Sequence, residues 1–438
     1  MGRRDPGKPT CRVPSDMGKA QAMTTDSLKP RPILIALALA LAAELLFLAN
    51  LTIPAKPVFD EVYYTEAART IARLYGPYNV EHPLFAKTIM AGGILLFGDN
   101  PLGWRFFSTV AGSAVVMGVF AIGWQIFGRV RPALYAAIFV LLNFTVFIQA
   151  RIAMLDGFMA AFVLIAVSAM IAAARAPAEQ TRRWLVLAAV LLGLAVGSKW
   201  TAIPYVAFAG LAMIALRLRG RERRYFAGVS LAPGLAILGG VSIATYFLTF
   251  APAFFYQYEP LTLATLIPFQ FRILTQQLAP LPIHPYQSVW WSWPLDLRPM
   301  WYLYEPVDGI QRGILLLGNP AVMWGGLIAV AACVYGGLRE RATPMLAAAL
   351  LWGGSYGMWV VVPKKIGFFY YYYLPSIFLG LALAAALERY AEPRFKYASE
   401  AALLITLALF AWFFPIISAA PLDNDQAFLR WTWFASWR

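Results

Sequence analysis

Long apolar runs recur from one end of this 438-residue chain to the other, and they constrain its fold more than any other feature. An apolar helix of about 20 residues crosses the ~30 Å hydrocarbon core of a bilayer. A soluble protein cannot bury so many such runs, since 60% of the residues are hydrophobic and only 13% are charged. The pattern predicts an all-α polytopic membrane protein.

The apolar runs and the charged breaks between them predict eleven membrane spans. Their boundaries are 33–51, 103–127, 132–149, 155–174, 184–197, 202–216, 226–250, 313–336, 344–362, 367–387 and 398–418. We expect three parts: a disordered cytoplasmic leader (1–28), an N-terminal catalytic membrane module (29–250), and a second outside loop followed by a C-terminal four-span module (251–438).

The distribution of positive charge predicts the orientation. Most of the 36 Lys and Arg residues lie in the leader and in the short segments that follow every second span. Because these residues collect in cytoplasmic loops, we expect a plasma-membrane protein whose N-terminus is inside and whose C-terminus is outside. Two substantial outside loops result, 52–102 and 251–312. The net charge of +14 is spread over loop ends, which argues against a nucleic-acid partner.

The start of the chain and its cysteines add little to the functional prediction. The sequence PAKPVFDE follows the first apolar run where a signal peptide would have a small-residue cleavage site, so we expect an uncleaved span. Met23 is an alternative start. Cys11 and Cys333, far apart in the predicted topology, indicate neither a disulfide framework nor a metal cluster.

Two adjacent carboxylates, Asp60 and Glu61, follow the first span closely. A helical repeat of apolar residues comes next and predicts a helix lying along the outer membrane interface, with Tyr64, Ala68, Ile71 and Tyr75 on one face. Asp60 at the start of such a helix is explained either as a cap for free backbone N–H groups or as part of a functional site held near the bilayer.

Four cations face outside in the predicted topology, where positive charge is unexpected: Arg151, Lys199, Lys364 and Lys365. Asp156 follows Arg151 by five residues. An ionisable group at a span end costs free energy unless it finds water, a partner or a ligand. Together these residues could bind an anion such as a lipid phosphate. The alternative is that each extends to headgroups or pairs with a nearby carboxylate.

The second outside loop contains the aromatic segment LPIHPYQSVWWSWPLDLRPMWYLYEP, residues 281–306. Its tryptophans are dense enough for an interfacial aromatic belt. Tryptophan faces also stack on sugar rings, and His284, Asp296 and Arg298 are uncommon in a belt. Both explanations stay open.

Several segments resemble the protein O-mannosyltransferase family. VFDEVYYTEAA and EHPLFAK resemble its first luminal loop, ARIAMLDGF its arginine and Leu-Leu-Asp segment, GLAVGSKWTA its Lys-Trp segment, and HPYQSVWWSWPLDLRP with LLLGNPAVMWGG its bacterial C-terminal four-span region. The resemblance covers about residues 33–420 in the same order. The chain departs at His82-Pro83-Leu84-Phe85, which lacks a second proline and a glycine, and it lacks a soluble insert in the second loop. These differences concern the acceptor more than the reaction.

The resemblance implies a GT-C glycosyltransferase fold that transfers mannose, or a related sugar, from a polyprenyl-phosphate-linked donor to Ser/Thr hydroxyls of exported proteins, inverting the sugar configuration. By resemblance, Asp60 would be the general base and Glu61 would orient it or the acceptor. The implied donor-phosphate ligands are Arg151, Lys364, Lys365, Lys199 and Arg298; the implied sugar and acceptor pocket contains His82, His284, Tyr286, Trp290, Trp291 and Asp296; Asp156, which would hold Arg151, and Lys87 support the site. No cofactor or metal is expected, although the carboxylates Asp60, Glu61 and Asp156 could hold a divalent cation.

Two other functions remain as alternatives. A transferase of the same fold could act on lipid A sugars or a cell-surface glycan, but WWSWPLDLRP favours the protein-mannosylating branch. A transporter or flippase would predict internal repeats and charges at span centres. The sequence shows no repeat, and Glu44 is the lone clear charge within a span interior.

Overall fold

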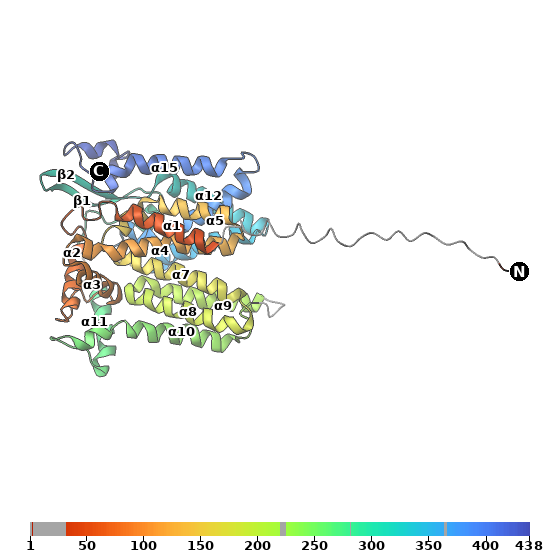
Figure 1. Cartoon of the computed structure of the whole chain (residues 1–438), viewed down its shortest axis with the longest axis horizontal. Coiled ribbons are helices and arrows are strands. Elements are labelled where there is room, and N and C mark those ends of the chain that lie inside the picture. The colour runs from red at the N-terminus through yellow and green to blue at the C-terminus, as the bar shows by residue number, and fades with distance from the viewer. Residues whose placement is uncertain (1, 3–31, 220–224, 281, 363–365) are drawn as a thin grey trace.

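The computed structural model describes residues 2, 32–219, 225–280, 282–362 and 366–438. All of the predicted leader except Gly2 lies outside these residues, as do Lys364 and Lys365. The described chain is mostly helical, and its long helices run side by side in one bundle (Figure 1).

The described helices match the predicted spans in order, and α2, α3 and α11 are additional helices within the two predicted outside loops. They are α1 (Pro32–Leu48), α2 (Glu61–Ala72), α3 (Phe85–Phe97), α4 (Pro101–Phe127), α5 (Val130–Leu141), α6 (Phe144–Ala150), α7 (Leu155–Arg175), α8 (Ala178–Ser198), α9 (Ile203–Arg219), α10 (Leu231–Leu248), α11 (Leu263–Leu278), α12 (Pro320–Arg339), α13 (Thr343–Val361), α14 (Tyr373–Ala386) and α15 (Ala398–Ile417). Short 3₁₀ turns η2 (Trp200–Ala202) and η5 (Phe369–Tyr372) precede α9 and α14.

The prediction of a polytopic helical membrane protein is confirmed. Nine helical segments of the described chain are long and apolar enough to cross a bilayer, and the pair α5–α6 forms a tenth candidate that is bent by 65°. Helix α1 is apolar but has 17 residues. The total of eleven spans stays a prediction.

The predicted span 313–336 begins too early, because residues up to Leu316 form a strand. Strands β1 (Met300–Val307) and β2 (Ile310–Leu316) pair antiparallel, and α12 begins only at Pro320. A short buried apolar run does not distinguish strand from helix. The local signal was the Asp308-Gly309 pair, whose φ angles of 53° and 73° suit a tight hairpin turn. The hairpin is a small β element within the predicted all-α fold.

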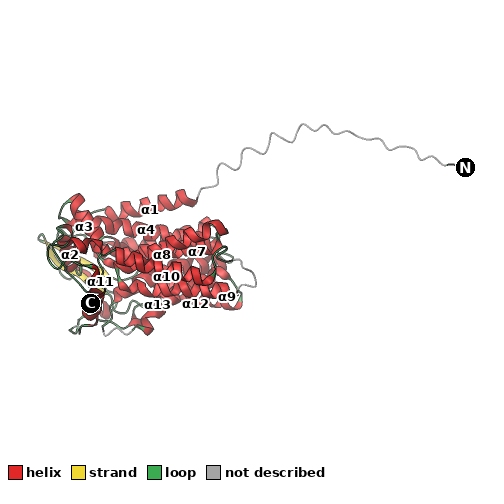
Figure 2. Cartoon of the chain, turned by 90° about the horizontal axis from the view of Figure 1, so that it is seen from below, coloured by secondary structure: helices red, strands yellow, loops and turns green. Residues whose placement is uncertain are grey.

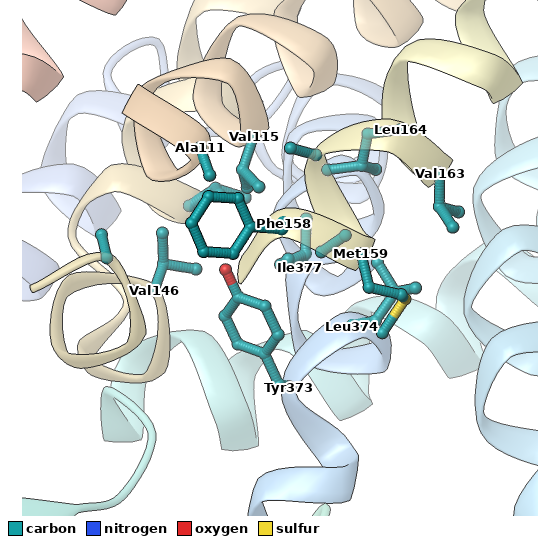
Figure 3. Close-up of a cluster of buried hydrophobic side chains, with 14 of the residues drawn as sticks. Ala111, Val115, Val146, Phe158, Met159, Val163, Leu164, Tyr373, Leu374 and Ile377 are labelled. Atoms are coloured by element: carbon teal, nitrogen blue, oxygen red, sulfur yellow. The ribbon is translucent and has the colours of Figure 1, made fainter. Parts of the chain in front are cut away.

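The short helices and the hairpin gather at one end of the bundle. Figures 1 and 2 place α2, α3, α11, the hairpin and the C-terminus at the end opposite to the start of α1. Helix α14 is almost completely buried and packs against α5, α12 and α13. In Figure 3, its residues Tyr373 and Ile377 lie among side chains of α4 and α7, such as Val115 and Phe158. Helices from both predicted modules therefore share one core.

Candidate active site

Asp60 lies immediately before α2, at the end of the bundle that carries α2, α3 and the hairpin. Its carboxylate makes no capping hydrogen bond to the helix backbone among the described residues. Instead, the Tyr64 hydroxyl donates to Asp60 Oδ2 at 3.3 Å. The capping explanation for Asp60 is therefore not supported.

The surroundings of Asp60 set its proton affinity. Burial raises the pKa of Asp60 to about 6; the positive charge of Lys199 opposes this shift, and the negative charge of Asp156 adds to it. A carboxylate with a pKa just below neutral is mostly ionised at pH 7 and still binds a proton well. This balance suits a general base.

Lys199 and Asp156 form a buried ion pair beside Asp60. Lys199 Nζ donates to both Asp156 oxygens, at 2.9 and 2.7 Å. The same ammonium lies 5.1 Å from the centre of the Tyr370 ring. The predicted pairing of Asp156 with Arg151 is wrong, because Asp156 lies in the first turn of α7, which packs along α8 and so meets the residue that follows α8.

Arg151 contacts the backbone at the end of α1. Its guanidinium donates to the carbonyl oxygens of Ala49 and Asn50 and lies over the Phe147 ring. The side chain is buried. These contacts tie the α6–α7 turn to the beginning of the first outer loop.

The Glu61 carboxylate is completely buried and fully engaged. Its two oxygens accept hydrogen bonds from Arg105 Nε and a terminal guanidinium nitrogen, both at 2.8 Å, in a bidentate pair. They also accept from the backbone N–H groups of Val58, at 2.8 Å, and Ala153, at 2.6 Å. Glu61 therefore joins α2, α4 and the α6–α7 turn.

Arg105 completes this network from α4. Beyond its bonds to Glu61, it donates to the carbonyl oxygens of Leu51, Pro54 and Lys56, at 2.8–3.1 Å. All five guanidinium N–H groups are thereby used. Sequence reasoning missed Arg105, although an ionisable residue within a predicted span was a signal for a buried partner.

Lys87 holds the loop that precedes α3. Its ammonium is buried and donates to the carbonyl oxygens of Asn79, at 2.7 Å, and His82, at 2.8 Å. Burial lowers the pKa of Lys87 to about 7. The supporting role of Lys87 in the site stays a prediction.

The same loop brings two polar side chains toward the site. The His82 ring meets the Tyr64 ring edge-on at 5.8 Å, and the Glu81 charge acts on Asp60. From α11, Gln277 Nε2 donates to the Glu81 carbonyl at 2.6 Å and lies 3.4 Å from His82 Nδ1.

Aromatic residues enclose Asp60 on the side of the hairpin and α14. Phe59 stacks on Tyr302 of β1 at 4.2 Å and meets Tyr370 edge-on at 5.9 Å. Gln149 donates to the Tyr302 hydroxyl at 3.4 Å. The roles of Tyr302 and Tyr370 were missed. Tyr302 belongs to the aromatic segment 281–306, and the run FFYYYYLP at residues 368–375 was the available signal for Tyr370.

The tryptophan-rich segment borders a separate outer cavity of about 810 Å³. Of the predicted site residues, four line this cavity: His284, Trp290, Trp291 and Arg298. Its walls Trp293 and Trp359 also pack against Tyr371. Tyr371 in turn packs edge-on against Tyr370 at 4.7 Å, and Tyr370 meets Phe59, the residue before Asp60.

Tyr286 and Asp296 do not line this cavity. The Tyr286 backbone N–H donates to His284 Nδ1 at 3.2 Å. Asp296 is completely buried; one carboxylate oxygen accepts from Gly318 N–H at 3.1 Å, and the other has no partner within the described chain. Burial raises the pKa of Asp296 well above its usual value. The predicted place of Asp296 in the sugar and acceptor pocket does not match this position.

Two family profiles match consecutive parts of the chain. The profile described as dolichyl-phosphate-mannose-protein mannosyltransferase matches residues 81–252, and that of the C-terminal four-TMM region of protein-O-mannosyltransferase matches residues 262–437. Together they cover most of the sequence.

Similar full-length proteins carry related names. The polyprenol-phosphate-mannose–protein mannosyltransferase of Mycobacterium tuberculosis is 27% identical, over 91% of this chain and 90% of the relative. The enzyme of the same name from Mycolicibacterium smegmatis is 25% identical, over 97% and 94% of the two chains.

Solved structures share the fold. The Saccharomyces cerevisiae protein O-mannosyltransferase Pmt1–Pmt2 complex, bound to its sugar donor, aligns with a TM-score of 0.79 at 15% identity, over 93% of each chain. ArnT from Cupriavidus metallidurans, bound to undecaprenyl phosphate, aligns with a TM-score of 0.55 at 19% identity, over 86% of this chain and 63% of that chain. The chain belongs to the protein O-mannosyltransferase family and has the fold of GT-C membrane glycosyltransferases.

Proposed function

We propose that this protein transfers mannose from a polyprenyl-phosphate-linked donor to Ser/Thr hydroxyls of exported proteins, with inversion at the anomeric carbon. One observation carries the proposal: in a bundle of this family, the Asp60 carboxylate lies beside a buried Lys199–Asp156 pair at the end that carries α2 and α3. The names of the full-length relatives support the choice of donor and of a protein acceptor.

Asp60 acts as the general base in this proposal. The acceptor hydroxyl attacks the anomeric carbon and passes its proton to the carboxylate, while the bond from that carbon to the phosphate oxygen breaks. Negative charge then develops on the departing polyprenyl phosphate, and fixed cations stabilise it. Lys199 is the described cation nearest to this role, because its charge already acts on Asp60. Arg151, Lys364 and Lys365 remain proposed phosphate ligands, whereas Arg298 lines the separate cavity together with His284 and Trp290, so we assign it to the acceptor.

The proposed location follows from the donor. Its phosphate lies at the headgroup level, so the catalytic carboxylate belongs at the same depth as the outer ends of the spans. We place the end of the bundle that carries α2, α3 and the hairpin outside the plasma membrane, with the N-terminus in the cytoplasm.

Purified protein in liposomes provides the test. Synthetic polyprenyl-phosphate-mannose with labelled mannose is supplied together with a pool of Ser/Thr-rich peptides. Labelled peptide supports the proposal. Consumption of donor without peptide labelling would favour a lipid or glycan acceptor, and movement of intact donor across the bilayer without consumption would favour a flippase.

The proposed base predicts a pH dependence. Because Asp60 accepts a proton only when ionised and its pKa is about 6, kcat/KM should fall about tenfold per pH unit below pH 6. Initial rates between pH 5 and 8 measure this limb, with donor binding followed over the same range as a control. An activity that stays level down to pH 5 would contradict the assignment.

Substitutions in the neighbouring ion pair should move this limb in opposite directions. The Lys199 charge lowers the pKa of Asp60 and the Asp156 charge raises it. Lys199→Met should therefore shift the fall in activity to higher pH, and Asp156→Asn should shift it to lower pH. The measurement is kcat/KM against pH for each variant at a temperature where thermal unfolding has not begun. Equal shifts in one direction would show that the pair acts through the fold rather than through charge.

A further inference from the structure

The segment that follows α15 runs along the β hairpin and is hydrogen-bonded to it. We call residues 418–437 the C-terminal strap. Leu422 N–H donates to the Gln311 carbonyl of β2 at 2.9 Å, and the Arg312 guanidinium donates to the Ala419 carbonyl at 2.7 Å. Figure 1 shows the C-terminus at the same end as β1 and β2.

Tyr304 of β1 makes further hydrogen bonds to the strap. The Tyr304 hydroxyl donates to the Asp425 carbonyl at 2.8 Å and accepts from Phe428 N–H at 3.3 Å. The Phe428 ring packs edge-on against both Tyr304, at 5.2 Å, and Trp301, at 6.1 Å. The strap therefore fixes both strands of the hairpin.

The hairpin is also a wall of the candidate active site. Tyr302 of β1 stacks on Phe59, the residue that directly precedes Asp60. A shift of the hairpin would therefore move the aromatic surface next to the proposed base.

The other end of the strap holds the tryptophan-rich segment. Trp437 is completely buried, and its indole Nε1 donates to the backbone carbonyl of Asp296 at 2.6 Å. The Trp437 ring stacks on Trp433 at 5.8 Å, and the neighbouring Ser436 lines the outer cavity. This bond therefore holds the tryptophan-rich segment, other residues of which line the cavity.

A third tryptophan strengthens the same junction. Trp324 of α12 donates from Nε1 to the Leu295 carbonyl at 3.2 Å and packs against Trp433 of the strap at 6.5 Å. Trp293, two residues before Leu295, packs against Tyr371, whose neighbour Tyr370 contacts both Tyr371 and Phe59. Contacts of the strap thus reach both the hairpin beside the base and the wall of the cavity.

We propose that the C-terminal strap is a positioning element, and that Trp437 is the positioning residue that sets the cavity wall relative to Asp60 for the acceptor. The inference rests on the proposed function, because it takes the outer cavity as the place where the acceptor peptide lies. The strap touches neither Asp60 nor the Lys199–Asp156 pair through any described contact, so its effect falls on the acceptor rather than on the donor.

The test is Trp437→Phe, which keeps an aromatic ring but removes the N–H that binds the Asp296 carbonyl. Trp431→Phe is a matched control: the Trp431 indole donates to the Trp412 carbonyl at 2.6 Å, so it loses a similar bond from the same strap but on the side of α15. KM for the peptide, KM for polyprenyl-phosphate-mannose and thermal stability are measured for both variants in liposomes. Amide hydrogen exchange of residues 288–298 is followed in the same samples.

We expect Trp437→Phe to raise the peptide KM about three- to tenfold, the scale of one lost hydrogen bond, and to speed amide exchange in 288–298. The donor KM should stay within twofold, and Trp431→Phe should leave all of these unchanged. Equal increases in both KM values, or faster exchange with an unchanged peptide KM, would overturn the proposal. If the wild type labels no peptide, the proposed function fails. Amide exchange of 288–298 that is no faster in Trp437→Phe than in the wild type would separately overturn the positioning role of the strap.

Discussion

Replacement of Asp60 by asparagine is expected to lower kcat for mannose transfer by roughly two to four orders of magnitude, the usual contribution of a placed proton acceptor. Asparagine has nearly the same shape as aspartate, but its amide cannot take the proton of the attacking hydroxyl. The partly buried site and the hydroxyl of Tyr64 can accommodate the amide, so the fold and donor binding should be preserved. Labelled-mannose transfer in liposomes and a separate donor-binding assay measure the two effects.

Glu66→Gln is the matched control, on the same helix. Glu66 is half-exposed and pairs with Arg69 at 3.0 Å, and an exposed pair of this kind contributes at most about 1 kcal/mol. Its activity should equal that of the wild type. If Asp60→Asn transfers mannose as fast as the wild type, another group takes the proton and the proposed mechanism is wrong.

The sequence predicted the parts of this protein that depend on local pattern. Membrane spans are long and strongly apolar, so their order and type were predictable, and the positions of Asp60 and Lys199 near span ends followed from them. The hairpin was missed because the end of β2, residues 313–316, is apolar and joins the apolar run of the helix that follows. A turn pair such as Asp308-Gly309 carries a weaker signal than a twenty-residue apolar run.

The pairings inside the site could not be predicted, because they depend on tertiary packing. Asp156 was expected to hold its sequence neighbour Arg151, yet its partner is Lys199, 43 positions away. Glu61 was expected to orient the base or the acceptor, yet its carboxylate binds Arg105, 44 positions away. Composition and spacing identify which side chains are costly to bury, but helix packing decides which of them meet.

The network of Glu61 and Arg105 carries the second large expected effect. Arg105→Leu leaves the Glu61 carboxylate buried without its cation, and breaking a buried pair by removing one partner costs about 3–5 kcal/mol. The carbonyl groups of Leu51, Pro54 and Lys56 lose their donor at the same time, and each unsatisfied buried group adds about 1–3 kcal/mol. The unfolding temperature of the purified variant in detergent micelles should therefore be lower than that of the wild type, and thermal unfolding measures it.

Arg272→Leu is the control for the loss of a guanidinium. Arg272 pairs with Glu259 at 2.8 Å on the surface, with both side chains about half-exposed, so this variant should unfold within a few degrees of the wild type. Arg105→Lys should lie between Arg105→Leu and the wild type, because an ammonium keeps a positive charge near Glu61 but has three donors and cannot reproduce the five-bond fork. An Arg105→Leu midpoint equal to that of the control would show that the network is not required for the fold.

Because Glu61 directly follows Asp60 and also binds Ala153 N–H, any fraction of Arg105→Leu that remains folded should also transfer mannose more slowly. This combined loss of stability and rate would distinguish the network from Asp60, whose replacement affects the rate alone.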